Sequence, residues 1–335
     1  MSNIINYTLN ELVDKIKSKE ISSKELTSAY IERSKSSKKL NVYIEETFDD
    51  ALKNSEKFDA NPNFDKKLAG IPFAVKDLFC TKNVKTTAGS KILENFVPAY
   101  ESTVTQNLWD AGAILLGKLN CDEFAMGSSN ETSFFGNVIS PIDDNLVPGG
   151  SSGGSASALA AKLTPATIGT DTGGSIRQPA SFTGTVGLKP TYGSCSRYGI
   201  VAFASSLDQA GPMTRNVQDS ALVLEVISSF DSKDSTSIDF KRPSYLSNLN
   251  KNIKGKKIGI PKEYRVDNMP SEIEKLWEKG KEYLKDCGAE VIDISLPHTN
   301  YALPTYYIVA PAEASSNLAR YDGVKYGYRA EGENL

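Results

Sequence analysis

The chain has 335 residues, of which 39% are hydrophobic and 24% are charged, and its formal net charge is −3. This apolar content is sufficient for a sizeable core, and the slightly acidic balance gives no basic surface for direct binding to nucleic acid. The sequence has no stretch approaching 18 apolar residues and no signal-peptide pattern, so we expect neither membrane spanning nor secretion. The four cysteines are scattered and the only histidine is His298, which favours a reducing, cytoplasmic location and no metal site.

The N-terminal region, residues 1–60, has mainly helical patterns. Thr8 and Glu11 form a capping-box pattern ahead of an amphipathic run, and Ser22 and Glu25 repeat it. The sequence therefore predicts that the chain begins with amphipathic helices.

From residue 68 onward, short apolar runs alternate with helical patterns. Strands are predicted within 69–75, 113–116, 166–169, 257–260 and 290–294, and helices within 104–111, 155–161, 217–227 and 273–284. This alternation predicts an α/β fold, a mixed β-sheet core covered on both faces by helices, in one domain over residues 1–335. The polar stretch 232–252 is interpreted as a surface excursion and not as a domain boundary.

Two short motifs resemble known sites but lack the right context. The run 112–118 begins like a phosphate-binding loop, but Leu119 stands where a serine or threonine is needed, and the apolar interior favours a strand. Ser36 and Lys39 form a Ser-x-x-Lys pair inside a lysine-rich run typical of a solvated helix end. Neither motif predicts a site.

A third motif leaves an alternative open. The run 149–153 fits the nucleophile elbow of α/β-hydrolases, with Asp293 and His298 downstream as potential partners. Such an elbow should follow a buried strand, whereas residues 143–148 are mostly polar and end in proline. The hydrolase arrangement is therefore the weaker alternative.

The main candidate site combines two serines and a lysine. Ser151 and Ser175 each lie in a glycine-framed cluster, 24 residues apart, and Lys76 ends the apolar run 70–75. Lysine can accept a proton from serine only as the neutral amine, and lowering its pKa from about 10.4 to about 7 requires on the order of 5 kcal/mol of environmental bias. Strand alternation directs Asp77 to the opposite face, where it cannot hold Lys76 as an ammonium.

Several runs together resemble a known enzyme family. Lys76, the run 149–155 and the run 171–177 resemble the amidase signature family, which uses a Ser-cisSer-Lys triad. The runs 122–128 and 187–193 are similar to one branch of it, glutamine-hydrolysing subunits that supply ammonia for converting glutamyl-tRNA(Gln) to glutaminyl-tRNA(Gln). The resemblance extends essentially from end to end.

The resemblance implies a role for each triad residue. Ser175 is expected to be the nucleophile, Ser151 the serine that relays its proton, and Lys76 the base. The peptide bond between Gly150 and Ser151 is expected to be cis. The implied reaction is hydrolysis of the glutamine side-chain amide through an acyl-Ser175 intermediate.

The resemblance also implies contacts with substrate. The backbone of Thr172, Gly173 and Gly174 is expected to form the oxyanion hole, where glycines allow a close approach. Tyr306 and Ser128 are expected to line the glutamine pocket.

Partners are implied in place of cofactors. By the resemblance, this chain holds no cofactor or metal; it assembles with B and C subunits, and a partner uses ATP and Mg²⁺ and binds the glutamyl-tRNA(Gln). Members of this branch continue well beyond position 335, and the groups that hold the α-carboxylate and α-amino group of glutamine lie in that later part. We therefore expect a C-terminally truncated chain that hydrolyses glutamine poorly alone. A stand-alone amidase and a non-catalytic, partner-binding remnant are the open alternatives.

Overall fold

The computed structural model describes residues 3–332. Its internal contacts form two compact units, residues 1–246 with 312–335, and residues 247–311. The change of unit falls inside the polar stretch 232–252. None of residues 235–256 is buried, so this stretch lies on the surface. One domain over residues 1–335 stays a prediction, and residue 335 itself lies outside the described residues.

The first unit is built on a six-stranded sheet with the order β1-β3-β2-β4-β6-β5. Its strands are β1 (Tyr43–Glu46), β2 (Pro72–Lys76), β3 (Ile114–Leu119), β4 (Thr167–Asp171), β5 (Val186–Gly187) and β6 (Gln209–Thr214). Strand β2 runs parallel to β3 and β4, and the other pairs are antiparallel. The predicted mixed sheet is confirmed, and the run 112–118 contributes to β3 instead of a phosphate loop.

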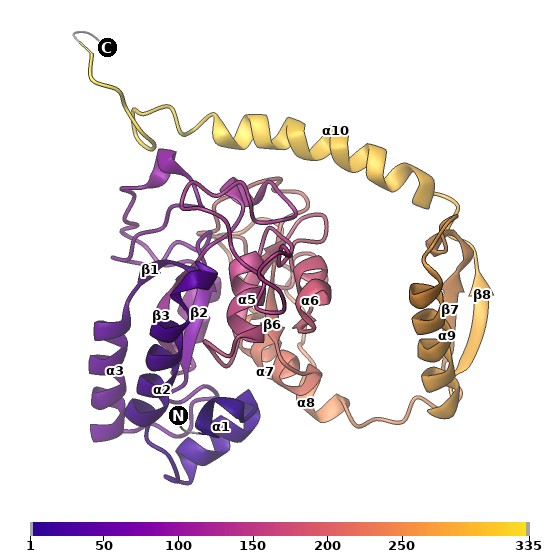
Figure 1. Ribbon diagram of the computed structural model, residues 1–335, viewed down its shortest axis with the longest axis horizontal. Helices are drawn as coiled ribbons and strands as arrows, with labels where there is room; N and C mark the ends of the chain where they lie inside the picture. Colours follow the sequence, from indigo (N-terminus) through magenta and orange to yellow (C-terminus); the bar gives the residue numbers. More distant parts are fainter. Residues whose placement is uncertain (1–2, 333–335) are drawn as a thin grey trace. The chain divides into compact units, whose positions relative to one another are not determined.

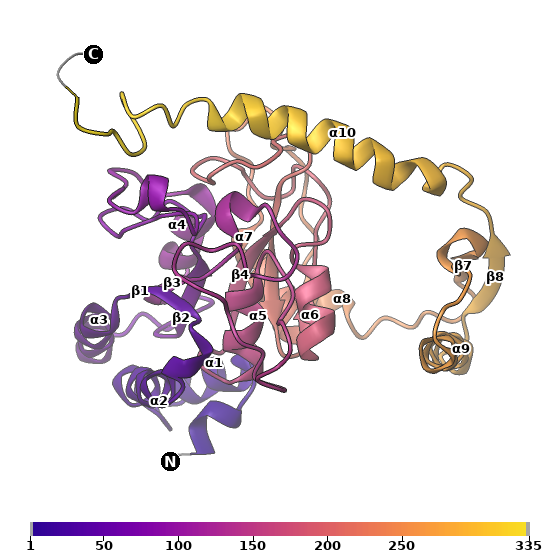
Figure 2. The same ribbon diagram turned by 45° about the horizontal axis from the view of Figure 1, so that its top comes forward.

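Helices lie on both sides of this sheet (Figures 1 and 2). They are α1 (Leu9–Lys17), α2 (Ser23–Ser36), α3 (Phe48–Ala60), α4 (Thr103–Asp110), α5 (Gly153–Ala160), α6 (Arg177–Thr183) and α7 (Val217–Ile227), with the short α8 (Tyr245–Asn248) at the boundary between the units. Thr8 forms the predicted capping box with Glu11. The large apolar cluster joins α1, α2, α4 and α7 to the strands, and a small one joins α5, α6 and β6.

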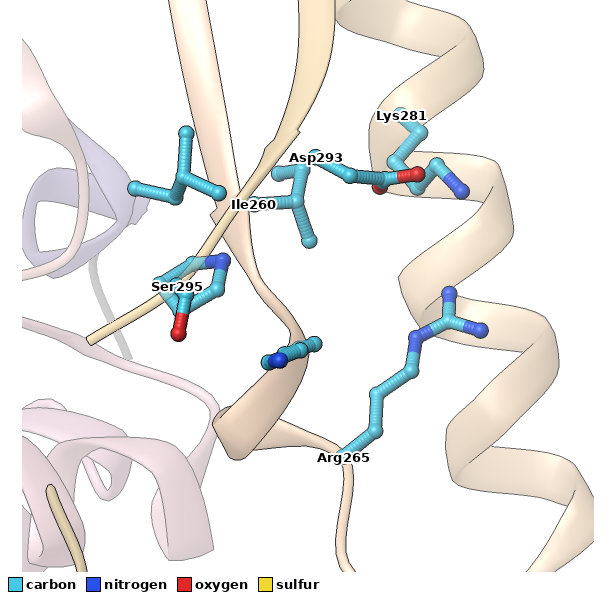
Figure 3. A pocket seen from close by; sticks show the side chains of 8 residues that line it. Ile260, Arg265, Lys281, Asp293 and Ser295 are labelled. Carbon is cyan, nitrogen blue, oxygen red and sulfur yellow. The ribbon is translucent and has the colours of Figure 1, made fainter. Parts of the chain in front are cut away.

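The second unit contains the parallel pair β7 (Lys257–Pro261) and β8 (Glu290–Ile294) together with α9 (Ser271–Asp286). Helix α10 (Thr299–Leu318) begins in this unit, and its residues from 312 onward belong to the first. A cavity of about 620 Å³ in this unit is lined by Ile260, Pro261, Lys262, Arg265, Lys281, Asp293, Ile294 and Ser295. Figure 3 shows Arg265 extending toward α9, where it pairs with Glu278. None of the predicted triad residues lines this cavity.

The position of the candidate site follows from the parallel strands. Because β2 and β4 are parallel neighbours, their carboxyl ends lie at the same edge of the sheet. Helix α5 packs against both strands. Gly154 also lets the start of α5 lie against the residue that follows β3, since a Cβ there would lie 2.3 Å from the carbonyl oxygen of Asn120. The segment 149–152, which leads into α5, is thereby held close to the ends of β2 and β4. Within residues 3–332, no helix combines the length and apolar content needed to cross a membrane.

Candidate active site

Lys76 is the last residue of β2, and its side chain is fully buried among hydroxyl groups. Its Nζ lies 2.7 Å from Ser151 Oγ, 3.0 Å from Ser152 Oγ and 3.0 Å from Thr170 Oγ1. Asp77 turns to the other side, as predicted, and pairs with Lys118. Within the part of the chain that the structure describes, no carboxylate forms an ion pair with the Lys76 amine.

Burial lowers the pKa of Lys76 from 10.5 to about 8, because the ammonium form loses its hydration. The thiol of Cys121, whose pKa burial raises to about 12, is uncharged at that pH. The charges that oppose the shift are those of Asp122, Asp171 and Asp208. A substantial fraction of Lys76 is thus neutral near pH 8 and able to accept a proton.

The hydrogen bonds around Lys76 favour Ser151 as the source of that proton. A neutral amine has two N–H groups and one lone pair. Ser152 Oγ donates to the carbonyl of Thr170 at 3.2 Å, so Ser152 must accept from Lys76, and Thr170 Oγ1 can accept the second N–H. The lone pair is then left for the hydroxyl of Ser151.

Ser151 is held by its backbone as well. The Gly150–Ser151 peptide bond is cis, as predicted. Gly150 N–H donates to Gln178 Oε1 at 3.0 Å, and Ser151 O accepts from Asp122 N at 3.3 Å. Gly150 must be glycine here, since a Cβ would lie 2.1 Å from Asp122 Oδ2.

Ser175 lies in the loop between β4 and α6 and is 8% exposed, in contrast to the fully buried Ser151. Its carbonyl oxygen accepts from Ser152 N at 3.2 Å, which ties the two serine segments together. The structure thus brings all three predicted triad residues to one edge of the sheet.

Asp171 closes the loop that contains Ser175. Its carboxylate accepts from Gly174 N at 2.8 Å and Ile176 N at 3.2 Å, and Arg177 binds both of its oxygens, at 2.9 and 3.0 Å. Burial acts in the opposite direction, but these hydrogen bonds, led by those of Arg177, lower the pKa of Asp171. The Gly174 N–H therefore already donates to Asp171. Of the three predicted oxyanion donors, Thr172 and Gly173 are the two whose N–H groups are not used by Asp171.

Comparison with known proteins extends this picture. The sequence profile of the family described as Amidase matches residues 25–335. The A subunit of glutamyl-tRNA(Gln) amidotransferase from Pelagibacter ubique is 77% identical over 335 residues, which are 100% of this chain and 69% of that protein. The protein of the same name from Caulobacter vibrioides (strain NA1000 / CB15N) is 61% identical over 339 residues, covering 99% of this chain and 69% of its own length. The chain belongs to the amidase family.

Solved structures agree with this assignment. The A subunit of glutamyl-tRNA(Gln) amidotransferase from Thermotoga maritima has a TM-score of 0.82 and 39% identity, over 95% of this chain and 67% of that one. The peptide amidase of Stenotrophomonas maltophilia has a TM-score of 0.85 and 33% identity, over 94% and 67% of the two chains. The predicted family and fold class are confirmed.

The α/β-hydrolase alternative loses its structural basis in this amidase fold. Residues 141–150, ahead of Ser151, contain turns and bends and no strand. His298 is exposed, and its ring lies 6.5 Å from that of Tyr301. The elbow pattern is thus a coincidence of the glycine-rich segment.

The two residues predicted to line the glutamine pocket have different surroundings. The backbone carbonyl of Ser128, whose side chain is exposed, accepts from Gln178 Nε2 at 2.9 Å. Because Gln178 also holds Gly150, Ser128 is linked to the triad through its backbone. Tyr306 is half-buried on α10, with its ring 5.4 Å from that of Tyr307. Their roles toward substrate stay predictions.

Several residues around this amidase site were not predicted. They are Ser152, Thr170, Arg177, Gln178 and Asp208. The sequence did contain a signal for the pairing of Arg177 with Asp171, since the two opposite charges lie in one motif, six positions apart across a glycine turn. The contacts of Gln178 and Asp208 join distant segments and leave no local pattern. Within residues 3–332, no cluster of three or more His, Cys, Asp or Glu side chains could hold a metal.

Proposed function

We propose that this chain is the glutamine-hydrolysing subunit of a glutamyl-tRNA(Gln) amidotransferase. The observation that carries the proposal is the fully buried Lys76 amine, which lies 2.7 Å from Ser151 Oγ and has no ion pair with a carboxylate within residues 3–332. The 77% identity to the A subunit from Pelagibacter ubique supports glutamine as the substrate.

The triad residues carry out amide hydrolysis in two steps. Ser175 Oγ attacks the side-chain carbonyl carbon of glutamine, and its proton passes to Ser151, whose own proton moves to neutral Lys76. The resulting oxyanion is stabilised by the backbone N–H groups of Thr172 and Gly173. The C–N bond then breaks as the proton returns through Ser151 to the nitrogen, which leaves as ammonia.

Water completes the cycle. It attacks the acyl-Ser175 carbonyl while Lys76, again through Ser151, accepts its proton. The C–O bond to Ser175 breaks, glutamate is released, and the proton returns to Ser175. Every proton removed is therefore returned by the same lysine.

The ammonia serves a partner subunit in this proposal. The chain works in the cytoplasm as one member of a heterotrimer with B and C subunits. A partner subunit, which binds glutamyl-tRNA(Gln), uses ATP and Mg²⁺ to activate it for amination. The net charge of −3 is consistent with RNA contacts supplied by a partner.

Labelling with a diazoketone analogue of glutamine tests the site. Ser175 is expected to be the labelled residue, and Ser175→Ala should abolish labelling while the protein stays folded. Peptide mass spectrometry locates the adduct. An adduct on Ser151 would overturn the assignment of Ser175 as nucleophile.

Coupling to tRNA tests the wider function. Mixing the full-length protein with B and C subunits, ATP, Mg²⁺ and glutamyl-tRNA(Gln) should give glutaminyl-tRNA(Gln) with glutamine as donor. Efficient glutamine hydrolysis without any transfer to tRNA would instead indicate a stand-alone amidase. A protein that is not labelled, does not hydrolyse glutamine and transfers nothing to tRNA would indicate a non-catalytic, partner-binding remnant.

A further inference from the structure

One buried carboxylate beside the proposed oxyanion loop takes no part in proton transfer. Asp208 is 5% exposed and accepts hydrogen bonds from Thr172 Oγ1 at 2.6 Å, Phe203 N at 2.8 Å and Ala204 N at 3.2 Å. These bonds join the loop that precedes Ser175 to the turn 203–208. Because Asp208 touches none of the triad side chains, any effect on the reaction must pass through Thr172.

The loop has few other anchors where the oxyanion would form. Gly173 is exposed and Thr172 is half-buried. Within residues 3–332, the backbone N–H groups of Thr172 and Gly173 have no protein acceptor, whereas Gly174 N–H is taken by Asp171. The two free N–H groups can therefore face a substrate. Among the described residues, Thr172 is held by the end of β4 on one side and by Asp208 on the other.

The turn that carries Asp208 is itself well anchored. Ser206 N donates to Glu313 Oε2 at 2.9 Å, and Asn317 Nδ2 donates to the carbonyl of Phe203 at 3.1 Å. Arg197 Nη1 donates to the carbonyl of Ser205 at 2.6 Å. The carboxylate of Asp208 is thus a fixed point against which the glycine-rich loop can be held.

We infer that Asp208 is a positioning residue that, through its hydrogen bond to Thr172, holds the Thr172 N–H toward the oxyanion formed when Ser175 attacks. This inference rests on the proposed function. An N–H group that turns away loses an interaction made mainly in the transition state, so acylation slows while substrate binding changes little.

Acetylation of Ser175 by p-nitrophenyl acetate tests the inference, with p-nitrophenolate release for the rate and peptide mass spectrometry for the site. Thr172→Val, which removes the hydroxyl but keeps the shape, should lower the limiting acylation rate by about 10- to 100-fold with an almost unchanged half-saturating concentration. Thr172→Ser retains the hydroxyl and should lose less of the acylation rate than Thr172→Val. A wild-type rate in Thr172→Val would overturn the inference.

A double-mutant cycle tests whether Asp208 acts through its hydrogen bond to Thr172. Asp208→Ala should slow acylation in the wild-type background and add little in the Thr172→Val background, because both changes break one bond. Asp208→Asn keeps an acceptor for Thr172 and should lose less than Asp208→Ala. Additive effects of Asp208→Ala and Thr172→Val would overturn the inference. If Asp208→Ala does not fold, the acylation rate of Thr172→Val alone tests the inference.

A matched control separates this bond from threonine–carboxylate bonds in general. Thr8 Oγ1 donates to Glu11 Oε2 at 2.9 Å at the start of α1, and Thr8→Val should acylate at the wild-type rate. Equal slowing in Thr8→Val would show a general structural effect and overturn the inference. A wild-type protein that is not acetylated on Ser175 would instead defeat the proposed function itself.

Discussion

Two fully buried lysines near the ends of neighbouring strands have opposite surroundings. Lys118, on β3, lies 3.3 Å from the carboxylate of Asp77 and donates to the carbonyl of Phe79 and to Thr86 Oγ1, both at 2.7 Å. Lys76, on β2, has three hydroxyl groups as its hydrogen-bond partners among the described residues, and no ion pair with a carboxylate there. The difference shows that burial alone does not make a lysine a base, because a carboxylate partner stabilises the ammonium form.

The same comparison explains why Asp77 matters although it follows Lys76 directly. Strand alternation sends the two side chains to opposite faces, so Asp77 neutralises Lys118 and leaves Lys76 without a counter-ion. Burial raises the pKa of Asp77, and the charge of Lys118 opposes that shift. Adjacent residues of one strand thus supply an ion pair on one face and a base on the other.

The largest expected effect is the loss of the base. Lys76→Ala should lower the rate of Ser175 labelling by the glutamine analogue by about 10³- to 10⁴-fold, because no other group is placed to take the proton from Ser151. Time-resolved mass spectrometry of the adduct measures this rate. Labelling at more than a tenth of the wild-type rate would remove Lys76 from the mechanism, provided that circular dichroism shows an intact fold.

The effects of replacing the two lysines on the free energy of unfolding should have the opposite order, with the larger loss at Lys118. Lys118→Met leaves the Asp77 carboxylate buried without its cation and should lower the free energy of unfolding by about 3–5 kcal/mol. Lys76→Met removes an amine whose charged form is penalised, so we expect no loss at pH 7. Urea unfolding of both variants measures the difference, and a similar loss in Lys76→Met would contradict the comparison.

The pH dependence of stability follows from the lowered pKa of Lys76. Between pH 8 and pH 10.5 the folded state binds fewer protons at this site than the unfolded state, so the stability of the wild-type protein should rise with pH over that window. The difference between 10.5 and about 8 corresponds to a destabilisation of roughly 3 kcal/mol, which is present in full below pH 8 and relieved above pH 10.5. Urea unfolding across this pH range measures the rise, which Lys76→Met should lack.

The smallest effect concerns one of the hydroxyls around Lys76. Thr170→Val removes an acceptor that favours the ammonium, so the midpoint of the pH–rate profile should move down, and the plateau rate should fall about 2- to 10-fold as the amine loses orientation. Thr167→Val is the matched control on the same strand, since Thr167 Oγ1 is buried and has no hydrogen-bond partner within residues 3–332. Equal effects of both substitutions would show that the hydroxyl at Thr170 has no special role.

The sequence predicts the strands that lie in apolar runs. Strand β8 has the predicted bounds, whereas β2, β3 and β4 each begin and end one to three residues later than predicted. Strand β6 has no such pattern, because Gly211 and Pro212 interrupt it and its pairing with β4 decides its structure. No pattern predicts α10, which contains Pro304 and Pro311.

In the candidate site, too, the sequence predicts some residues and not others. Lys76, Ser151 and Ser175 are recognisable from motifs because each lies in a distinctive local run. The bond between Thr172 and Asp208 joins residues 36 positions apart, and the bond between Gln178 and Gly150 joins residues 28 apart. Such contacts depend on the folded sheet and have no counterpart in local sequence.

The pH dependence of Ser175 acylation by the glutamine analogue tests the central claim most directly. If neutral Lys76 is the base, the rate should rise with pH and reach half its maximum near pH 8, where the pKa of the buried amine lies. The rise should vanish in Lys76→Ala and persist in His298→Ala. A rate that does not change between about pH 6 and pH 10, or a midpoint near 6.5 that disappears in His298→Ala, would contradict the lysine mechanism.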